Sequence, residues 1–195
     1  MLQDINTQGL IFLHSFITTP KEAQVFGFIA DFPIFFLPVF LFVSWIYFSY
    51  SKQKEQKNTL LFIFYSTLVA FIINMVIQSF VTFDRPESVL EATNTLILNH
   101  IPDASFPSDH TAISIAFVTA LYLGGFKKVA FMFLPFAMLM NISRIISGVH
   151  WPLDVFAGTI VGILSGGIVF HYLRYNKYIL SLNKTLLKIA HIIKL

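Results

Sequence analysis

Long apolar runs separated by short polar segments dominate the hydrophobic pattern of this 195-residue chain. Five of the runs approach the roughly 20 residues that a helix needs to cross the hydrocarbon core of a bilayer. They cover residues 32–50, 59–82, 111–126, 129–145 and 153–173. Continuous runs of this length cannot be exposed strands, and buried helices of soluble proteins are usually shorter. The pattern therefore predicts an all-α fold, a polytopic transmembrane helical bundle of about five spans.

Two further segments, residues 5–18 and 178–195, are amphipathic rather than continuously apolar. In the second, Lys184 and Lys188 stand one helical turn apart among Leu and Ile. Both segments are candidates for helices that lie in the membrane interface. Burial against the bundle is the alternative for the first, and a solvated or frayed end is the alternative for the second. The whole chain is expected to form one membrane-embedded domain, with 176–195 as its basic amphipathic tail.

Composition supports the membrane location and removes several other functions. Hydrophobic residues make up 56% of the chain and charged residues only 12%, which a soluble domain of this size cannot accommodate. The absence of cysteine excludes disulfides and thiolate metal sites. The formal net charge is +3, but no basic stripe is interleaved with aromatic residues, so no nucleic-acid partner is expected. Lipids and a membrane-borne substrate are the expected partners, and the oligomeric state is left open.

The charged residues divide unequally between the two sides that five spans create. One side collects ten of the thirteen Lys and Arg residues, in the segments 51–58, 127–128 and 174–195. The other side carries every acidic residue except Glu55. Cytoplasmic loops accumulate Lys and Arg. We therefore predict an integral protein of the bacterial cell (inner) membrane, with the Lys-rich loops and the C-terminal tail in the cytoplasm.

A polar cluster is predicted at the outer side, where only three basic residues occur. Two of these, Arg85 and Arg144, lie at the ends of spans, as do His110, His150 and Asp154. Ionisable residues gathered at one depth of a membrane protein indicate a functional site. Arginine binds phosphate oxygens with paired, charge-assisted hydrogen bonds, and helices that begin on this side direct free N–H groups toward the same anion. The cluster therefore predicts a phosphate-binding site.

The spacing within the cluster also suggests a reaction. Ser108 suits the N-cap of the third span and Pro152 the first position of the fifth. His150 and Asp154 stand one turn apart if that helix begins near His150, and Asp154 would then hold one ring nitrogen and leave the other as a nucleophile. His110, with an unperturbed pKa of about 6.5, is suited to general acid catalysis. Two histidines with opposite roles predict a double displacement through a phosphohistidine, and no cofactor is predicted.

Three short motifs together resemble the signature of the type 2 phosphatidic acid phosphatase (PAP2) family, which also includes vanadium haloperoxidases. The motifs are Arg85-Pro86, Pro107-Ser108-Asp109-His110 and Ser143-Arg144-x5-His150-x3-Asp154, within a signature region of residues 78–154. The resemblance implies an integral membrane lipid phosphatase that needs no metal. It also implies a role for each matching position: His150 as nucleophile, Asp154 as its orienting partner, His110 as acid, and Arg85, Ser108 and Arg144 as phosphate ligands.

Two positions depart from the family pattern. Gln78 replaces the usual lysine seven residues before the first arginine, so one phosphate contact is neutral or comes from another residue. Asp109 replaces the usual glycine, and its carboxylate would repel phosphate unless it binds a substrate hydroxyl, a cation or His110. With Ser143, these two are candidates for substrate contact or tuning. Pro-Ser-Asp-His is similar to the subgroup that dephosphorylates undecaprenyl diphosphate, which is therefore the predicted substrate.

Alternative functions remain open at this point. Phosphatidylglycerophosphate, phosphatidate and the phosphates of lipid A would present a phosphate at the same depth. A metal-dependent hydrolase could use His110, Asp109, His150 and Asp154 as ligands, although two arginines are poor neighbours for a cationic site. A small transporter or scaffold is the non-enzymatic alternative. Its charged residues should lie near mid-membrane, whereas the interiors of these spans are nearly free of charge.

Overall fold

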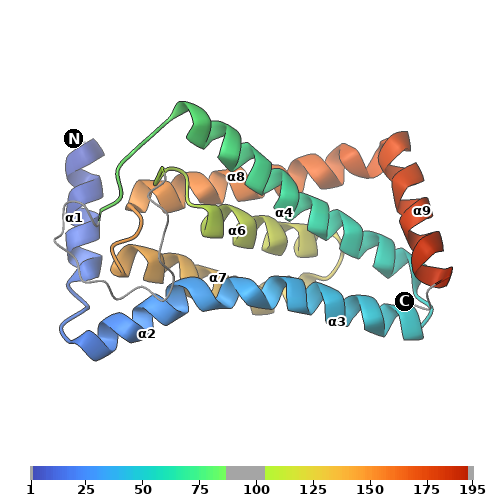
Figure 1. Cartoon of the computed structure of the whole chain (residues 1–195), viewed down its shortest axis with the longest axis horizontal. Coiled ribbons are helices and arrows are strands. Elements are labelled where there is room, and N and C mark those ends of the chain that lie inside the picture. The colour runs from blue at the N-terminus through green and yellow to red at the C-terminus, as the bar shows by residue number, and fades with distance from the viewer. Residues whose placement is uncertain (1, 87–103, 193–195) are drawn as a thin grey trace.

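The computed structural model describes residues 2–86 and 104–192, which form helices and connecting turns without any strand (Figure 1). The elements in chain order are α1 (Leu2–His14), α2 (Pro20–Asp31), the 3-10 helix η1 (Phe32–Phe35), α3 (Phe36–Tyr50), α4 (Lys54–Phe80), α6 (Asp109–Leu123), α7 (Lys127–Ile146), α8 (Pro152–His171), the 3-10 helix η2 (Leu173–Tyr175) and α9 (Lys177–Ile192). The predicted all-α bundle is confirmed, and each predicted span corresponds to a helix.

Within residues 2–86 and 104–192, four helical segments are long and apolar enough to cross a membrane: Pro20–Tyr50, Lys54–Phe80, Lys127–Ile146 and Pro152–Tyr175. The first is longer than the predicted span, because α2, η1 and α3 follow one another directly. A capping box begins it at Pro20. The Glu22 N–H donates to Thr19 Oγ1 at 3.3 Å, and the Thr19 N–H donates to the Glu22 carboxylate at 2.9 Å. Hydropathy alone does not record this start, since α2 mixes polar and apolar residues.

α6 lies at the centre of the bundle and is shorter than each of the four segments given above. Its 15 residues span about 22 Å, less than the roughly 30 Å of a hydrocarbon core. It packs against α4, α7 and α8, and Ala112, Ala116, Phe117 and Ala120 are completely buried. A helix enclosed by protein does not have to match the bilayer thickness. Figure 1 shows that α6 begins further into the bundle than the point where α7 ends and α8 begins. The first residues of α6 therefore lie inside the bundle rather than at its end.

Two glycines of α8 bring α6 unusually close. A Cβ on Gly158 would lie 2.7 Å from the Ser108 carbonyl oxygen, and one on Gly162 would lie 2.7 Å from the carbonyl oxygen of Ala112. Small residues four apart allow helix backbones to approach in this way. The contact holds the start of α6 against the start of α8, where the sequence places most of the candidate site.

α1 lies across the end of the bundle at which α8 begins and α7 ends (Figure 1). Asn6 Oδ1 accepts a hydrogen bond from the Leu153 N–H at 3.0 Å. His14 Nδ1 lies 2.8 Å from the carbonyl oxygen of Ile146. Helix ends carry backbone groups without intrahelical partners, and α1 supplies partners for both helices. Two expectations were given for residues 5–18. Burial against the bundle is correct for the face of α1 that contacts α7 and α8.

α9 packs against α4 at the opposite end of the bundle. Asn183 is only 1% exposed, and it accepts a hydrogen bond from the Tyr65 hydroxyl at 2.7 Å while donating one to Asn58 Oδ1 at 2.7 Å. The tail is thus a docked helix as far as Ile192 rather than a frayed end. Its other face leaves apolar side chains exposed, as an interfacial helix does.

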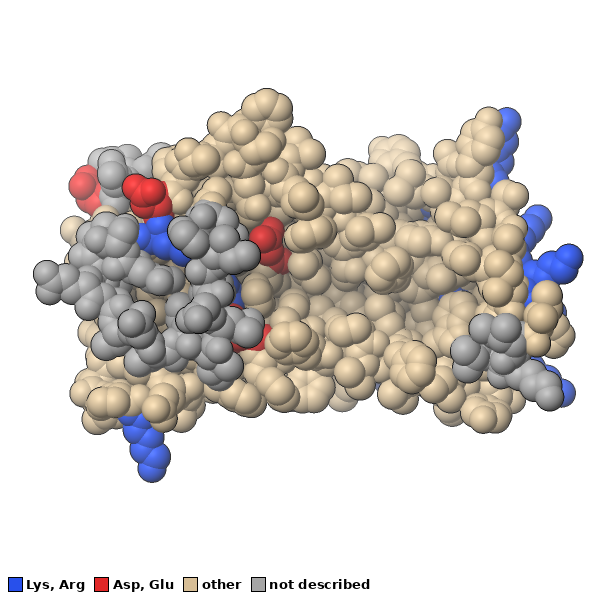
Figure 2. All heavy atoms as spheres, in the orientation of Figure 1, with Lys and Arg blue, Asp and Glu red and all other residues tan. Residues whose placement is uncertain are grey.

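Basic and acidic side chains gather mostly in opposite halves of the bundle. Figure 2 shows that most of the visible Lys and Arg side chains gather at the end formed by α9 and the α3–α4 connection. The visible acidic side chains lie in the opposite half. This separation agrees with the uneven distribution predicted from the order of the spans.

Candidate active site

The polar residues predicted from the motifs meet at the end of the bundle that α1 covers. α7 supplies Arg144, the turn after it supplies His150, and the first turn of α8 supplies Asp154. α6 supplies His110 in its first turn, and Arg85 lies just beyond the end of α4. Each side chain therefore comes from a helix end, as the order of the spans predicted.

His150 and Asp154 form a buried pair, 3% and 2% exposed. His150 Nδ1 lies 3.3 Å from Asp154 Oδ2, and Nε2 lies 3.3 Å from Arg144 Nη2. A guanidinium only donates hydrogen bonds, so Nε2 is the accepting nitrogen and we assign the proton to Nδ1, facing the carboxylate. In this tautomer the lone pair of Nε2 is oriented toward the Arg144 guanidinium. The arrangement suits a nucleophilic histidine with an orienting carboxylate.

The contact between His150 and Asp154 does not arise as the sequence suggested. α8 begins at Pro152, with Trp151 as its N-cap, so His150 precedes the helix. Asp154 reaches back across the N-cap and accepts the Trp151 N–H at 2.8 Å, and it also accepts the hydroxyl of the buried Ser105. The prediction of a helical turn beginning near His150 was wrong, although Pro152 at the first helical position was correct. Ser105, which is outside the motifs, was missed.

Arg144 is 1% exposed and joins the two sides of the site. Its Nη1 donates to Asp31 Oδ1 at 2.5 Å and to the Ala30 carbonyl oxygen at 3.2 Å, both at the end of α2. The same Asp31 oxygen lies 3.7 Å from His110 Nε2. Sequence reasoning missed Asp31, which it treated only as an acid outside the first span. The signal was its position directly before an apolar run.

Ser108 occupies the N-cap of α6, as predicted, but its hydroxyl does not cap the helix. The Ser108 N–H instead donates to the Asp154 carbonyl oxygen at 3.1 Å. Within the described ranges, Ser108 Oγ, Ser143 Oγ and Arg144 Nε are buried without a hydrogen-bond partner. Buried polar atoms are normally paired, and a bound phosphate would supply acceptors for such donors.

Arg85 anchors the segment after α4 to the turn that carries His150. Its Nη1 donates to the carbonyl oxygen of Val149 at 3.1 Å, and Trp151 Nε1 donates to the carbonyl oxygen of Asp84 at 2.9 Å. Arg85 is only partly buried. A second guanidinium is thus brought to Val149, the residue before His150, and the first motif is joined to the third.

The two departures from the family pattern contact each other. Gln78 Nε2 donates to Asp109 Oδ1 at 3.2 Å, and Asn74 Nδ2 donates to the same oxygen at 2.8 Å. Both amides also donate to the Pro107 carbonyl oxygen, at 3.1 and 3.3 Å. The Asp109 side chain therefore binds amides of α4, a partner that the sequence interpretation did not consider. Asn74 was missed, although its spacing of four residues from Gln78 places both on one helix face.

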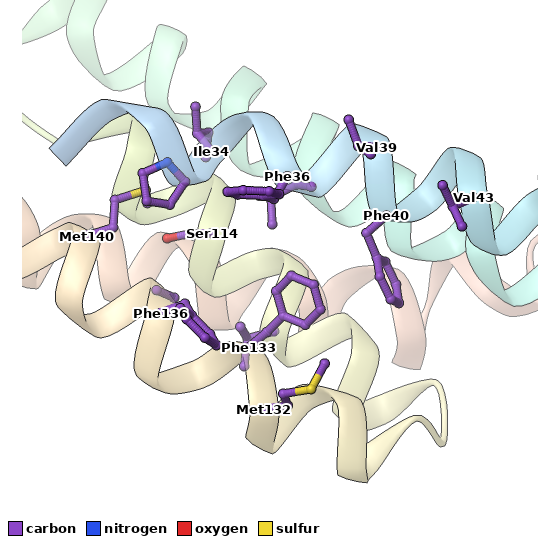
Figure 3. A pocket seen from close by; sticks show the side chains of 14 residues that line it. Ile34, Phe36, Val39, Phe40, Val43, Ser114, Met132, Phe133, Phe136 and Met140 are labelled. Atoms are coloured by element: carbon purple, nitrogen blue, oxygen red, sulfur yellow. The ribbon is translucent and has the colours of Figure 1, made fainter. Parts of the chain in front are cut away.

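An apolar groove of about 450 Å³ opens beside the site between α3, α6 and α7 (Figure 3). Among the side chains that line it are Ile34, Phe40, Val43, Phe133, Phe136 and Met140. One end of the groove adjoins the polar cluster, since Pro33 follows Asp31 by two residues and Met140 precedes Arg144 by one turn. A separate, more polar cavity is lined by Asp154 and Trp151. The polar cavity thus contacts the cluster at Asp154, whereas the apolar groove ends close in sequence to Asp31 and Arg144.

The family model described as the PAP2 superfamily matches residues 59–178. The chain belongs to this superfamily. It is 38% identical over 147 residues to the bacitracin transport permease protein BcrC of Bacillus licheniformis, covering 73% of this chain and 68% of that one. It is 30% identical over 149 residues to the undecaprenyl-diphosphatase BcrC of Bacillus subtilis, covering 76% and 74%. The crystal structure of Aquifex aeolicus LpxE matches with a TM-score of 0.66 and 26% identity, covering 86% of this chain and 96% of that one.

The PAP2 membership confirms the resemblance drawn from the three motifs. It also confirms the enzyme class, a membrane-embedded hydrolase that acts on phosphoric ester or anhydride bonds. The relatives support the undecaprenyl-diphosphate phosphatase subgroup. The matched range contains the motifs that supply both histidines and both arginines, but it excludes α2 and therefore Asp31.

Proposed function

We propose that this PAP2 protein removes the terminal phosphate of undecaprenyl diphosphate at the outer leaflet, through a phosphohistidine on His150. The observation that carries the proposal is the position of the Arg144 guanidinium. It lies between His150 Nε2, at 3.3 Å, and Asp31, at 2.5 Å, and Asp31 in turn lies beside His110. A phosphate held by Arg144 would have the nucleophile on one side and the general acid on the other.

The residues divide the reaction into two balanced steps. In the first, His150 Nε2 forms a bond to the terminal phosphorus while the bond to the bridging oxygen breaks, and His110 gives that oxygen its proton. Asp154 stabilises the imidazolium character that develops on His150, and Arg85 and Arg144 stabilise the phosphoryl charge. In the second step His110 takes a proton from water, which attacks the phosphohistidine and releases inorganic phosphate. His150 then returns to its original form.

The apolar groove supports a lipid on the leaving-group side. Nucleophile and leaving group lie roughly in line on opposite sides of the phosphorus during phosphoryl transfer. The groove adjoins Asp31, the neighbour of His110, whereas the polar cavity adjoins Asp154, the partner of the nucleophile. A lipid chain in the groove would therefore leave on the side of the proposed acid. The name of the Bacillus subtilis relative favours undecaprenyl diphosphate as the lipid.

The distribution of charge supports the outer leaflet. The Lys- and Arg-rich end of the bundle is opposite to the site (Figure 2), and positively charged segments favour the cytoplasmic side. Substrate added to the outside of sealed vesicles should release phosphate only when the α9 end faces the lumen. The side that α9 occupies can be read from protection of its lysines against a membrane-impermeant label.

The substrate is tested by phosphate release from undecaprenyl diphosphate, phosphatidylglycerophosphate, phosphatidate and lipid A in matched micelles. We expect the diphosphate to give the highest kcat/KM. His150→Ala should abolish release from every lipid, whereas the matched control His171→Ala, at the exposed far end of α8, should retain it. A higher kcat/KM for another lipid would replace the proposed substrate.

The remaining alternatives give separate outcomes in the same assay. Loss of activity in EDTA with recovery on adding zinc would support a metal-dependent hydrolase instead. Transport of the lipid across vesicles without any phosphate release would support a transporter. Incorporation of labelled phosphate into the protein, acid-labile as a phosphohistidine is and absent from His150→Ala, tests the proposed intermediate.

A further inference from the structure

Asp31 is a buried carboxylate at the junction of the proposed acid and the phosphate-binding arginine. It is 1% exposed and ends α2, which packs against α7. A charge so deeply buried is stable only when it is paired. Its Oδ1 accepts a hydrogen bond from Arg144 and lies 3.7 Å from His110 Nε2. Asp31 lies outside the PAP2 match, which begins at residue 59, and outside the three motifs.

The electrostatics of the site give this carboxylate a specific task. A general acid must carry a proton when the leaving group departs, but the neighbouring guanidinium groups of Arg85 and Arg144 oppose a third positive charge. Asp31 supplies a negative charge next to His110, while the other acids of the site have different partners. Asp154 contacts His150, and Asp109 binds amides of α4.

The contact between Asp31 and His110 is ionic rather than a strong hydrogen bond. A separation of 3.7 Å between Asp31 Oδ1 and His110 Nε2 is an ionic contact and is too long for a strong hydrogen bond. The carboxylate can therefore stabilise the imidazolium without retaining its proton. Asp31 also directly precedes η1, whose Pro33 and Ile34 line the apolar groove. The carboxylate is thus two residues along the chain from the groove lining, near the place where the bond to the lipid would break.

We propose that Asp31 is a positioning residue for leaving-group departure, which holds His110 ready to donate its proton and fixes Arg144 against the phosphate. This inference rests on the proposed function and extends it to a residue outside the family motifs. The site would then contain two histidine–carboxylate pairs with opposite tasks. Asp154 serves the histidine that attacks, and Asp31 serves the histidine that protonates.

The test compares two leaving groups in the full-length protein. Phosphatidate releases an alcohol that needs a proton, whereas 4-nitrophenyl phosphate releases a phenolate that needs little protonation. Asp31→Asn should lower kcat for phosphatidate about 100-fold and kcat for the aryl phosphate less than about threefold. KM should rise for both substrates alike, because the contact with Arg144 is weakened. His110→Asn should show the same selective loss in kcat, and His150→Ala should lose activity with both substrates.

Two further variants separate positioning from folding. Asp31→Glu keeps the charge and should recover part of the phosphatidate activity, with helical content and thermal unfolding measured for each variant. Glu22→Gln, which neutralises an acid at the other end of α2, is the matched control and should leave both substrates unaffected. The double variant Asp31→Asn/His110→Asn should lose little more than His110→Asn alone, since the two residues act as a unit.

The inference fails if Asp31→Asn lowers kcat equally for both leaving groups, which a purely structural role would do. It also fails if kcat for phosphatidate is unchanged. These results are distinct from failure of the proposed function, which would appear as a wild-type protein unable to release phosphate from any lipid, or as a His150→Ala variant that remains active.

Discussion

The two ends of the bundle bury polar side chains in opposite ways. At the α9 end, Asn183 is paired with both Tyr65 and Asn58. At the site end, Ser108 and Ser143 have buried hydroxyls without a hydrogen-bond partner among residues 2–86 and 104–192. Asn183, Ser108 and Ser143 are all almost completely buried, so the exposure of these side chains does not distinguish the two ends.

The two ends differ in how many of their buried polar groups have a hydrogen-bond partner. A saturated network contributes to stability, and removing one member leaves the others buried without partners. Donors that remain unsatisfied in the folded chain contribute little to its stability, but they are available to a ligand. The α9 end is therefore expected to respond to mutation through stability, and the site end through activity. Five variants test this contrast.

His150→Ala should give the largest effect and support the contrast. Loss of the nucleophile should reduce phosphate release on the order of 10⁴-fold. The free energy of unfolding in detergent should change by less than about 1 kcal/mol, since the contacts of His150 with Arg144 and Asp154 are both long, at 3.3 Å. Phosphate release and reversible unfolding would be measured on the same preparation. A large loss of stability would show that the pair is mainly structural.

Arg144→Ala should be an exception to this contrast, because it should lower both stability and activity. The buried Asp31 carboxylate would lose its guanidinium partner, which costs about 3–5 kcal/mol for buried pairs. Activity should also fall, because a phosphate ligand is removed. Denaturation in detergent would measure the first effect, and KM the second. The variant Arg144→Ala/Asp31→Ala should regain part of the stability without regaining activity, and failure to do so would refute the pairing.

Asn183→Ala should affect stability alone. Tyr65 and Asn58 would both lose a buried partner, which should lower the free energy of unfolding by about 2 kcal/mol. Thermal unfolding of detergent-solubilised protein would show the loss. Lys184→Ala on the same helix, at an exposed position, is the control. A fall in kcat for intact Asn183→Ala protein would indicate coupling between the two ends.

Ser108→Ala should have the opposite outcome. Its hydroxyl makes no hydrogen bond within the described part of the protein, so its removal should leave stability unchanged. KM for the lipid phosphate should rise about tenfold, equivalent to about 1.4 kcal/mol, if the hydroxyl binds phosphate. Steady-state kinetics would show the change. An unchanged KM would remove Ser108 from the binding site.

Gln78→Lys should have the smallest effect. A lysine here would face the Asp109 carboxylate and exchange the present hydrogen bond for an ion pair, so KM should change only a few-fold. With Asp109→Gly added, the lysine would be available to phosphate and should lower KM for the diphosphate. The coupling between the two changes should be about 1 kcal/mol in a double-mutant cycle. Additive effects would contradict the contact between positions 78 and 109.

Much of the fold was predictable because each span records its own length and polarity. The runs at 59–82 and 129–145 match α4 and α7 closely, since apolar side chains facing lipid leave a continuous signal. α2 was missed because its start depends on the cap at Thr19 rather than on hydropathy. α6 was predicted as a helix, but not as one enclosed by other helices, because enclosure depends on its neighbours.

The candidate site was predictable where several motifs place reactive residues at helix ends. His110, Arg144 and Asp154 were found in this way. Ser105 and Asp31 were not, because each lies outside the motifs and becomes relevant only through a contact distant in sequence. Ser105 contacts Asp154, 49 residues away, and Asp31 contacts Arg144, 113 residues away.

The sequence by itself determined the membrane-embedded helices, their alternating direction, the end at which the charges gather and the chemistry of the motifs. These are local properties, since hydropathy, charge and motif spacing are read directly along the chain. Only the tertiary structure decided that Asp109 binds amides of α4 and that Asp31 joins Arg144 to His110. It also decided that Asp154 reaches His150 across a helix cap. Such contacts depend on how close packed helices approach, and the small residues of α6 and α8 set that distance.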